Sequence, residues 1–384
     1  MTRVINDIAK TLEIPGIRVF ANKVSSYSDG INLTIGQPDF PTPENIRSAA
    51  IEAIRKGKTG YSHNAGLMKL RESISSFFAD TYGFHYDSAE EIVVTNGASE
   101  AIDSVLRTII RKGDEIIIPS PSYSGYEPLI RLNGGVPVYI DVSDSNFKVT
   151  PEKLIEAITD KTKAIIFNYP SNPTGISLSQ QETAALVDII MDKDFFIISD
   201  EIYSENTFSG EHTSFGSFRE IRDRLFLIHG LSKSHAMTGW RLGYVLGPAD
   251  LIRYVLRVHL NNSICASLPS QYAAIEALDH TRSFPQEMNE TYKARRDFIY
   301  DRLSTMGLKC NIPTGAFYIF PNVSHTGLDD LEFATRLLEE EHVAVVPGST
   351  FSNEGAGFIR VSYANSMANL EEGMERMERF MATL

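Results

Sequence analysis

Lys233 is the residue whose surroundings most favour covalent chemistry. It lies in the loop Gly230–Tyr244, among small and apolar residues, between two runs that predict strands. A lysine held among such residues loses solvation, which stabilises the neutral amine and makes it a better nucleophile. An amine of this kind can form a Schiff base with an aldehyde cofactor. Taken alone, the same loop also fits an ordinary solvated lysine.

Four other segments accompany this lysine loop along the chain. They are Thr34–Phe40, Asn168–Gly175, Ser199–Tyr203 and Gly357–Ala364. Together with the loop they resemble the class I/II aminotransferases, the pyridoxal-phosphate enzymes of fold type I, and the likeness covers nearly the whole chain. Within that family the chain is most similar to bacterial N-acetyl-diaminopimelate aminotransferases, with aromatic and broad-range aminotransferases as near neighbours.

Asp200 follows the apolar run Phe195–Ser199, so its carboxylate is expected at the carboxyl end of a buried strand, where open α/β sheets bind ligands. A helix N-cap is the alternative for this aspartate. The resemblance implies that Asp200 pairs with the pyridine nitrogen of the cofactor. It also implies that Tyr203 and Asn172 donate hydrogen bonds to the cofactor's 3'-oxygen. The residues alone leave a plain turn open for Asn172–Gly175.

A phosphate site is predicted where Gly97 precedes Ala98 and Ser99, because these residues follow a strand and open a helix, and backbone N–H groups at a helix start bind anions. The resemblance implies that Arg241 binds the same phosphate through its planar guanidinium. It adds Ser232 as a hydroxyl donor. The alternatives are a simple turn at Asn96–Gly97 and a surface ion pair for Arg241.

Two tyrosines are assigned to the cofactor site through the resemblance. Tyr123 matches the aromatic residue that stacks on the pyridine ring. Tyr61 matches a phosphate contact that crosses from the neighbouring subunit, which implies a homodimer. A core tyrosine and an exposed loop tyrosine are the respective alternatives.

Arg360 lies between apolar Ile359 and Val361 on a short predicted strand, so its side chain points to the opposite face from theirs. The resemblance implies that it grips the substrate α-carboxylate, with Gly36 and Asn172 beside it. A solvent-facing charge at a strand edge is the alternative. Arg18 is favoured as a surface arginine, although an arginine in an N-terminal arm can meet a distal carboxylate.

The fold class is predicted from short apolar runs that alternate with amphipathic stretches, which favours an α/β protein with a mostly parallel sheet flanked by helices. Amphipathic stretches run over Pro151–Ile158 and Ser179–Met191. The runs that predict strands are Ile92–Thr95, Glu115–Ile118, Val136–Ile140, Ala164–Phe167, Phe195–Ile198 and Leu225–Ile228.

A smaller α+β unit is predicted near the end of the chain. It begins with a long charged helix over Met288–Met306 and continues through helix Leu328–Glu341 and the strand Phe358–Val361. The resemblance adds that the N-terminal segment folds back onto this unit. We therefore expect a large cofactor-binding domain over residues 46–280 and a small domain of residues 1–45 with 281–384.

Composition excludes several classes of protein. The formal net charge of −13 and the lack of a Lys/Arg cluster argue against partners that are nucleic acids or anionic membranes. Two distant cysteines predict neither a disulfide framework nor a zinc site, and the nine histidines show no ligand spacing, so no metal is expected. No secretory or membrane-spanning segment is seen, and a cytoplasmic protein is expected.

The sequence thus predicts a pyridoxal-phosphate aminotransferase that works through a Schiff base on Lys233, with ping-pong kinetics and with 2-oxoglutarate and glutamate as one pair. Lys233, Asp200 and Tyr203 are the expected catalytic residues. N-acetyl-LL-2,6-diaminopimelate, from lysine biosynthesis, is a possible substrate. Aromatic or broad-range amino transfer remains open, as does a carbon–sulfur β-lyase, because the same residues would serve elimination.

Overall fold

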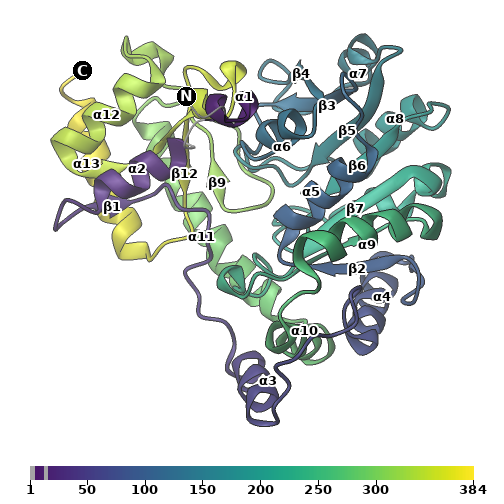
Figure 1. Cartoon of the computed structure of the whole chain (residues 1–384). Coiled ribbons are helices and arrows are strands. Elements are labelled where there is room, and N and C mark those ends of the chain that lie inside the picture. The colour runs from purple at the N-terminus through teal and green to yellow at the C-terminus, as the bar shows by residue number, and fades with distance from the viewer. Residues whose placement is uncertain (1–4, 13–15) are drawn as a thin grey trace, which may run out of the picture.

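The computed structural model describes residues 5–12 and 16–384, and its largest element is a seven-stranded sheet with the order β2-β8-β7-β6-β5-β3-β4 (Figure 1). Every neighbouring pair is parallel except those that involve β8, which runs antiparallel to both β2 and β7. The prediction of a mostly parallel sheet is confirmed. The strands are β2 (Ile92–Thr95), β3 (Glu115–Ser120), β4 (Val136–Asp141), β5 (Thr162–Asn168), β6 (Phe196–Asp200), β7 (Leu225–Gly230) and β8 (Gly243–Leu246).

Helices cover both faces of this sheet because its central strands are apolar on both sides. In β5, Ile165 and Phe167 pack on one face with residues of α7 and α8, whereas Ala164 and Ile166 pack on the other with residues of α5, α6 and α9. A capping box formed by Ser179 and Glu182 begins α8. These helices are α5 (Ala98–Ile109), α6 (Tyr126–Leu132), α7 (Pro151–Ala157), α8 (Gln180–Ile190) and α9 (Ala249–Ser263).

A helical layer packs against the β2 and β8 edge, at the bottom of Figure 1. It consists of α3 (Glu44–Arg55), α4 (Met68–Tyr82) and α10 (Leu268–His280). Short 3-10 turns connect other parts of the chain. They are η1 (Phe215–Ser217), η2 (Arg219–Arg224), η3 (Thr238–Trp240), η4 (Ser324–Thr326), η5 (Gly348–Thr350) and η6 (Asn353–Gly355).

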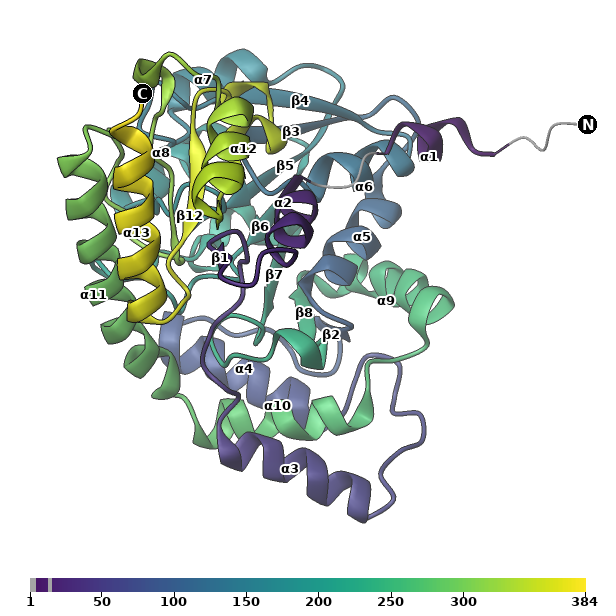
Figure 2. The same ribbon diagram turned by 90° about the vertical axis from the view of Figure 1, so that its left-hand side faces the viewer.

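The smaller unit combines both ends of the chain (Figure 2). Ile31 of β1 pairs in parallel with Val343 of β10, and Phe20 and Val24 of α2 enter the same core as the C-terminal helices. An antiparallel sheet of order β11-β12-β9 lies beside them. The elements of this unit are α2 (Gly16–Val24), β1 (Ile31–Asn32), α11 (Phe284–Thr305), β9 (Tyr318–Ile319), α12 (Asp330–Glu341), β10 (Val343–Ala344), β11 (Val346–Pro347), β12 (Ile359–Ser362) and α13 (Met367–Met381). The short helix α1 (Asp7–Thr11) lies outside this unit and contacts α6.

The domain boundaries at residues 46–280 stay a prediction, and residues 1–4 and 13–15 of the expected small domain lie outside the described residues. Among the residues that are described, no helix has the length and apolar character needed to cross a membrane. Over the same residues, no group of three or more His, Cys, Asp or Glu side chains is arranged to hold a metal ion.

Candidate active site

A cavity of about 730 Å³ lies where the carboxyl ends of β5, β6 and β7 meet β9, β12 and α2 of the smaller unit. Its volume is within the range of pockets that hold small molecules and cofactors. All but one of the site residues predicted from the sequence line it, and the exception is Tyr61. The lining includes Gly36, Ala98, Ser99, Tyr123, Asn172, Asp200, Tyr203, Ser232, Lys233, Arg241 and Arg360.

Lys233 follows β7 and reaches into this cavity, where its Nζ donates a hydrogen bond to the backbone oxygen of Gly36 at 2.6 Å. Burial lowers the pKa of Lys233, and the charges of Arg360 and Arg241 lower it further, to about 8. Because a lysine amine is normally protonated at neutral pH, this shift brings the nucleophilic form within reach. The side chain is therefore suited to the covalent role that the sequence predicts.

Asp200 ends β6, as the sequence predicts, and no helix begins there, so the N-cap alternative is wrong. Its Oδ2 accepts a hydrogen bond from the hydroxyl of Tyr126 at 2.6 Å, and its Oδ1 accepts one from Ile202 N at 3.3 Å. Burial raises the pKa of Asp200 to about 6, although both hydrogen bonds act to lower it. A buried carboxylate of this kind favours a cationic partner.

Tyr126 is a site residue that sequence reasoning missed. It is the first residue of α6, it is 1% exposed, and it lines the cavity. Its ring lies edge-on to that of Tyr123, with ring centroids 5.3 Å apart. The sequence does contain a second tyrosine after the predicted strand Glu115–Ile118. Its hydrogen-bond partner Asp200 is distant in the sequence, so no local pattern marks this tyrosine as a site residue.

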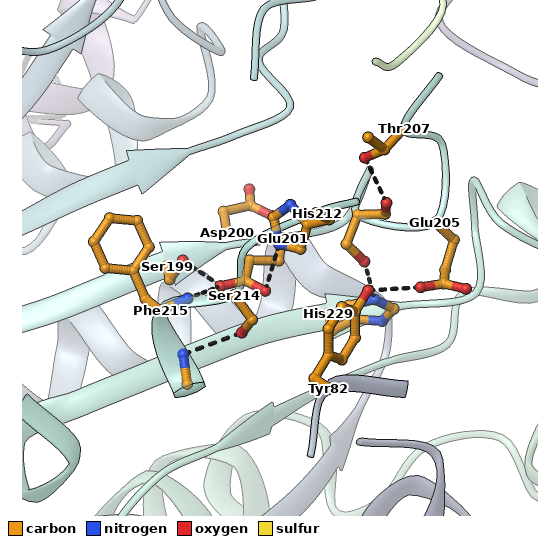
Figure 3. Close-up of polar contacts among 12 residues, drawn as sticks. Tyr82, Ser199, Asp200, Glu201, Glu205, Thr207, His212, Ser214, Phe215 and His229 are labelled. Atoms are coloured by element: carbon orange, nitrogen blue, oxygen red, sulfur yellow. Dashed lines mark hydrogen bonds and ion pairs between the residues drawn. The ribbon is translucent and has the colours of Figure 1, made fainter. Parts of the chain in front are cut away.

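A second set of buried polar groups fixes the chain next to Asp200 (Figure 3). The carboxylate of Glu201 accepts hydrogen bonds from Ser199 Oγ at 2.8 Å and Phe215 N at 3.0 Å, and it pairs with His212 Nε2 at 2.9 Å. Along an extended chain, neighbouring side chains point in opposite directions. Asp200 and Glu201 therefore keep separate partners, and the rigid network around Glu201 holds Asp200 in place.

An anion-binding corner lies at the start of α5. Gly97 has a φ of 88° and supplies no side chain to cap the helix, so the first N–H groups of α5 remain free for a ligand. A Cβ on Gly97 would lie 2.6 Å from Nη2 of Arg241, which shows how closely this guanidinium approaches the turn. Ser99 and Ser232 also line the cavity. Nη1 of Arg241 donates to the backbone oxygen of Thr238 at 2.9 Å, and the ion pairs among the described residues do not include Arg241, so the surface ion pair is not formed.

Arg360 is 1% exposed, so the alternative of a solvent-facing charge is wrong. Its Nη1 donates to Asn172 Oδ1 at 2.8 Å, and its Nη2 donates to the backbone oxygen of Thr34. Its Nε is buried and has no hydrogen-bond partner among the described residues. Asn172 is also buried, and its side chain accepts the hydrogen bond from this arginine. Its role is therefore more than that of a plain turn.

Tyr318 of β9 is a second missed site residue. Its hydroxyl lies 2.7 Å from the hydroxyl of Tyr203, and its ring lies 4.4 Å below the guanidinium carbon of Arg360. No local pattern in the sequence predicts that Tyr318 lies next to Tyr203. A Cβ on Gly36 would lie 1.9 Å from the Tyr318 hydroxyl, so this close approach requires glycine at position 36.

Arg18 is exposed, as the sequence favours, but it also lines the cavity from α2. Tyr61 is 81% exposed and lies outside the cavity lining. The contact that the sequence predicts for Tyr61 in a neighbouring subunit therefore stays a prediction.

The charges that line the cavity define the ligand it suits. Four cationic side chains, Arg18, Lys233, Arg241 and Arg360, face one carboxylate, Asp200. A ligand with separated anionic groups, a basic ring nitrogen and a carbonyl for the lysine would match this set, and pyridoxal phosphate with an amino acid has these features. The partnerless Nε of Arg360 and the uncapped start of α5 fit such ligands. The fold and the site are those of a pyridoxal-phosphate-dependent enzyme.

Comparisons with known proteins place the chain more narrowly. Residues 28–377 match the family model described as aminotransferase class I and II, and the chain belongs to this family. It is 45% identical to a probable N-acetyl-LL-diaminopimelate aminotransferase of Bacillus subtilis, over 99% of this chain and 96% of that protein. Pyridoxal phosphate is the cofactor of the family, and the protein is a transaminase.

Solved structures agree with this placement. The aspartate aminotransferase of Thermus thermophilus with maleate superposes with a TM-score of 0.94 at 35% identity, over 98% of this chain and 100% of that one. The aromatic aminotransferase of Pyrococcus horikoshii superposes with a TM-score of 0.90 at 39% identity, over 95% and 99% of the two chains. The prediction of fold type I is therefore confirmed.

Proposed function

We propose that this protein moves an amino group between an L-amino acid and a 2-oxo acid, with glutamate and 2-oxoglutarate as one pair. The observation that carries the proposal is the approach of Lys233, with its lowered pKa, to Asp200 and Arg360 within one cavity. Pyridoxal phosphate, when bound, supplies an aldehyde that takes up the amino group and a ring that withdraws electrons from the substrate.

Each predicted site residue then has a distinct task. Asp200 holds a proton on the ring nitrogen, and Asn172 and Tyr203 donate to the ring oxygen. Arg360, Gly36 and Asn172 fix the substrate α-carboxylate. The remaining residues bind the cofactor, with Tyr123 against the ring and with the phosphate held by Ala98, Ser99, Ser232, Arg241 and Tyr61 of a neighbouring copy.

Lys233 has two tasks in this proposal. Its amine would hold the cofactor through the aldehyde carbon until the amino group of a substrate takes its place, and the freed Nζ would then move the proton at the substrate Cα. Arg360 positions the Cα–H for this transfer. Because the same arginine holds each acid in turn, the first product leaves before the second acid enters, which gives ping-pong kinetics.

Substrates with an acidic far end are proposed as the preferred amino donors. Arg241 is assigned to the phosphate and Arg360 to the α-carboxylate, so Arg18 is the cation on the cavity lining that remains for a second carboxylate. Glutamate has such a group, and so does N-acetyl-LL-2,6-diaminopimelate, the compound that appears in the printed name of the Bacillus subtilis relative. A role in lysine biosynthesis follows as part of the proposal.

An aromatic or broad-range donor specificity is the second candidate, supported by the likeness to the Pyrococcus horikoshii aromatic aminotransferase. Amino donors should be screened against 2-oxoglutarate with purified protein, and the donors should include N-acetyl-LL-2,6-diaminopimelate, aspartate and the aromatic amino acids. We expect acidic donors to lead. Preference for aromatic donors would favour the second candidate, and pyruvate release from cystathionine without a 2-oxo acid would favour a β-lyase.

The active form is proposed to be a homodimer in which Tyr61 enters the neighbouring site. The high exposure of Tyr61, with its position outside the cavity of its own chain, supports this arrangement. The cytoplasmic location expected from the sequence stays a prediction.

A further inference from the structure

The first turn of α5 carries a carboxylate, Glu100, that contacts a buried histidine, His259. Glu100 is the third residue of this helix, and its Oε2 accepts hydrogen bonds from Asn96 N at 2.5 Å and Asn96 Nδ2 at 3.0 Å. Its Oε1 pairs with Nδ1 of His259 at 2.8 Å. His259 comes from α9 and is fully buried. The Glu100 carboxylate thus connects the Asn96–Gly97 turn, which precedes α5, with α5 itself and with α9.

This arrangement differs from an ordinary helix start. A Ser, Thr, Asp or Asn at the N-cap normally accepts from the first free N–H groups of its helix. Here the N-cap is Gly97, which makes no such bond, while Glu100 satisfies the N–H of Asn96 outside the helix. The turn is therefore fixed, and the N–H groups of Ala98 and Ser99 stay open toward the cavity.

The same turn also sets the place of Arg241. Gly97 packs so closely on this guanidinium that an added Cβ would lie 2.6 Å from Nη2, and a Cβ on Gly243 would lie 2.4 Å from Ala98 N. With no free space between these groups, a shift of the turn displaces the arginine and the helix start together.

The ionised carboxylate of Glu100 also needs a hydrogen-bond donor for each of its oxygens. Burial acts to raise the pKa of Glu100, but hydrogen bonds to His259 and Asn96 outweigh it and lower the pKa to about 2, so the carboxylate is ionised at neutral pH. An ionised carboxylate accepts, so Nδ1 of His259 donates, and Nε2 of His259 has no partner among the described residues. Without His259, Oε1 of the ionised Glu100 would lose this donor close to the proposed phosphate position.

We propose that Glu100 and His259 are positioning residues for the cofactor phosphate. Glu100 orders the Asn96–Gly97 turn that aims the first amides of α5 and places Arg241, and His259 holds Glu100 in place by donating from Nδ1 to its Oε1. The inference rests on the proposed phosphate-binding role of Ala98, Ser99 and Arg241. Neither residue touches the reacting atoms, so their removal should weaken cofactor binding rather than the chemical step.

The test measures binding of pyridoxal phosphate and of inorganic phosphate to the full-length, cofactor-free protein. Trp240 is the single tryptophan and precedes Arg241, so its fluorescence reports on this corner. Glu100→Gln keeps the side-chain shape but can accept from only one of its two partners, and we expect both Kd values to rise about tenfold. His259→Leu should weaken binding at least as much, because Oε1 of Glu100 then loses its donor.

Two further variants sharpen the test. In the double variant Glu100→Gln with His259→Leu, the loss of affinity should be smaller than the sum of the two single losses, because both side chains act through one shared hydrogen bond. Asp103→Asn is the matched control, since Asp103 is a buried carboxylate of α5 that pairs with Arg107, away from the turn. At saturating cofactor, kcat of Glu100→Gln should stay within about twofold of wild type.

The outcomes separate this inference from the proposal on which it rests. If Glu100→Gln and His259→Leu lower the melting temperature but leave both Kd values at the wild-type level, the pair only fastens α5 to α9 and the inference is overturned. Arg241→Met tests the phosphate site itself. If that variant also binds phosphate like wild type, the assignment of the site to the cofactor phosphate fails as well.

Discussion

Tyr126→Phe gives a prediction whose size follows from the structure. The variant removes one hydroxyl, which donates to Asp200 Oδ2 at 2.6 Å between residues that are 1% and 4% exposed. A hydrogen bond to a charged group contributes about 1.5–3 kcal/mol, and about 1.4 kcal/mol corresponds to one pKa unit. Loss of the bond should therefore raise the pKa of Asp200 by about 1 to 2 above its present value of about 6.

The assay is the pH dependence of pyridoxal-phosphate affinity for the cofactor-free protein. Asp200 must be ionised to hold a proton on the ring nitrogen, so wild-type affinity should fall as the pH drops through about 6. In Tyr126→Phe the fall should begin at higher pH. Tyr169→Phe is the control, because it removes another buried hydroxyl, one that accepts from Val149 N. A midpoint that stays in place or moves to lower pH in Tyr126→Phe would refute the reasoning.

Three further variants test other parts of the site. Arg360→Lys should raise KM for amino donors about 100-fold in steady-state kinetics, while the cofactor stays bound, because lysine lacks the planar fork of arginine; an unchanged KM would contradict its role. Arg18→Leu should lower kcat/KM for glutamate about tenfold but leave phenylalanine nearly unaffected, and equal effects on both donors would count against distal recognition. Lys233→Met should stabilise the cofactor-free protein toward urea by about 3 kcal/mol below pH 8, because burial holds the pKa of Lys233 at about 8. The folded protein binds fewer protons than the unfolded chain from pH 8 to about 10.5, so this gain should vanish across that window; a gain that persists above it would be inconsistent.

The central strands of the fold could be predicted from the sequence because burial on both faces leaves continuous apolar runs. Ile92–Thr95 matches β2 without change, and Leu225–Ile228 lies within β7. The ends of the strands could be predicted less well. The apolar run stops at Ile118, whereas β3 continues through Pro119 and Ser120. The antiparallel position of β8 between β2 and β7 depends on pairing between distant segments, which periodicity does not report.

The site was predictable where a residue follows a strand or belongs to a recognisable segment. Asp200 ends one buried strand and Lys233 follows another, and the structure brings them into one cavity. Tyr126, Tyr318 and Glu100 were missed for a common reason. Each acts through a partner distant in the sequence, and no local pattern marks a tyrosine or glutamate as the neighbour of a particular buried group.

Covalent attachment of the cofactor to Lys233 tests the central claim most directly. Purified protein should absorb in the visible, and borohydride reduction followed by peptide mass mapping should place a phosphopyridoxyl group on the peptide that carries Lys233. Lys233→Ala should lose this modification, the visible band and turnover together. Recovery of the modification on another lysine, or full turnover by Lys233→Ala, would contradict the account.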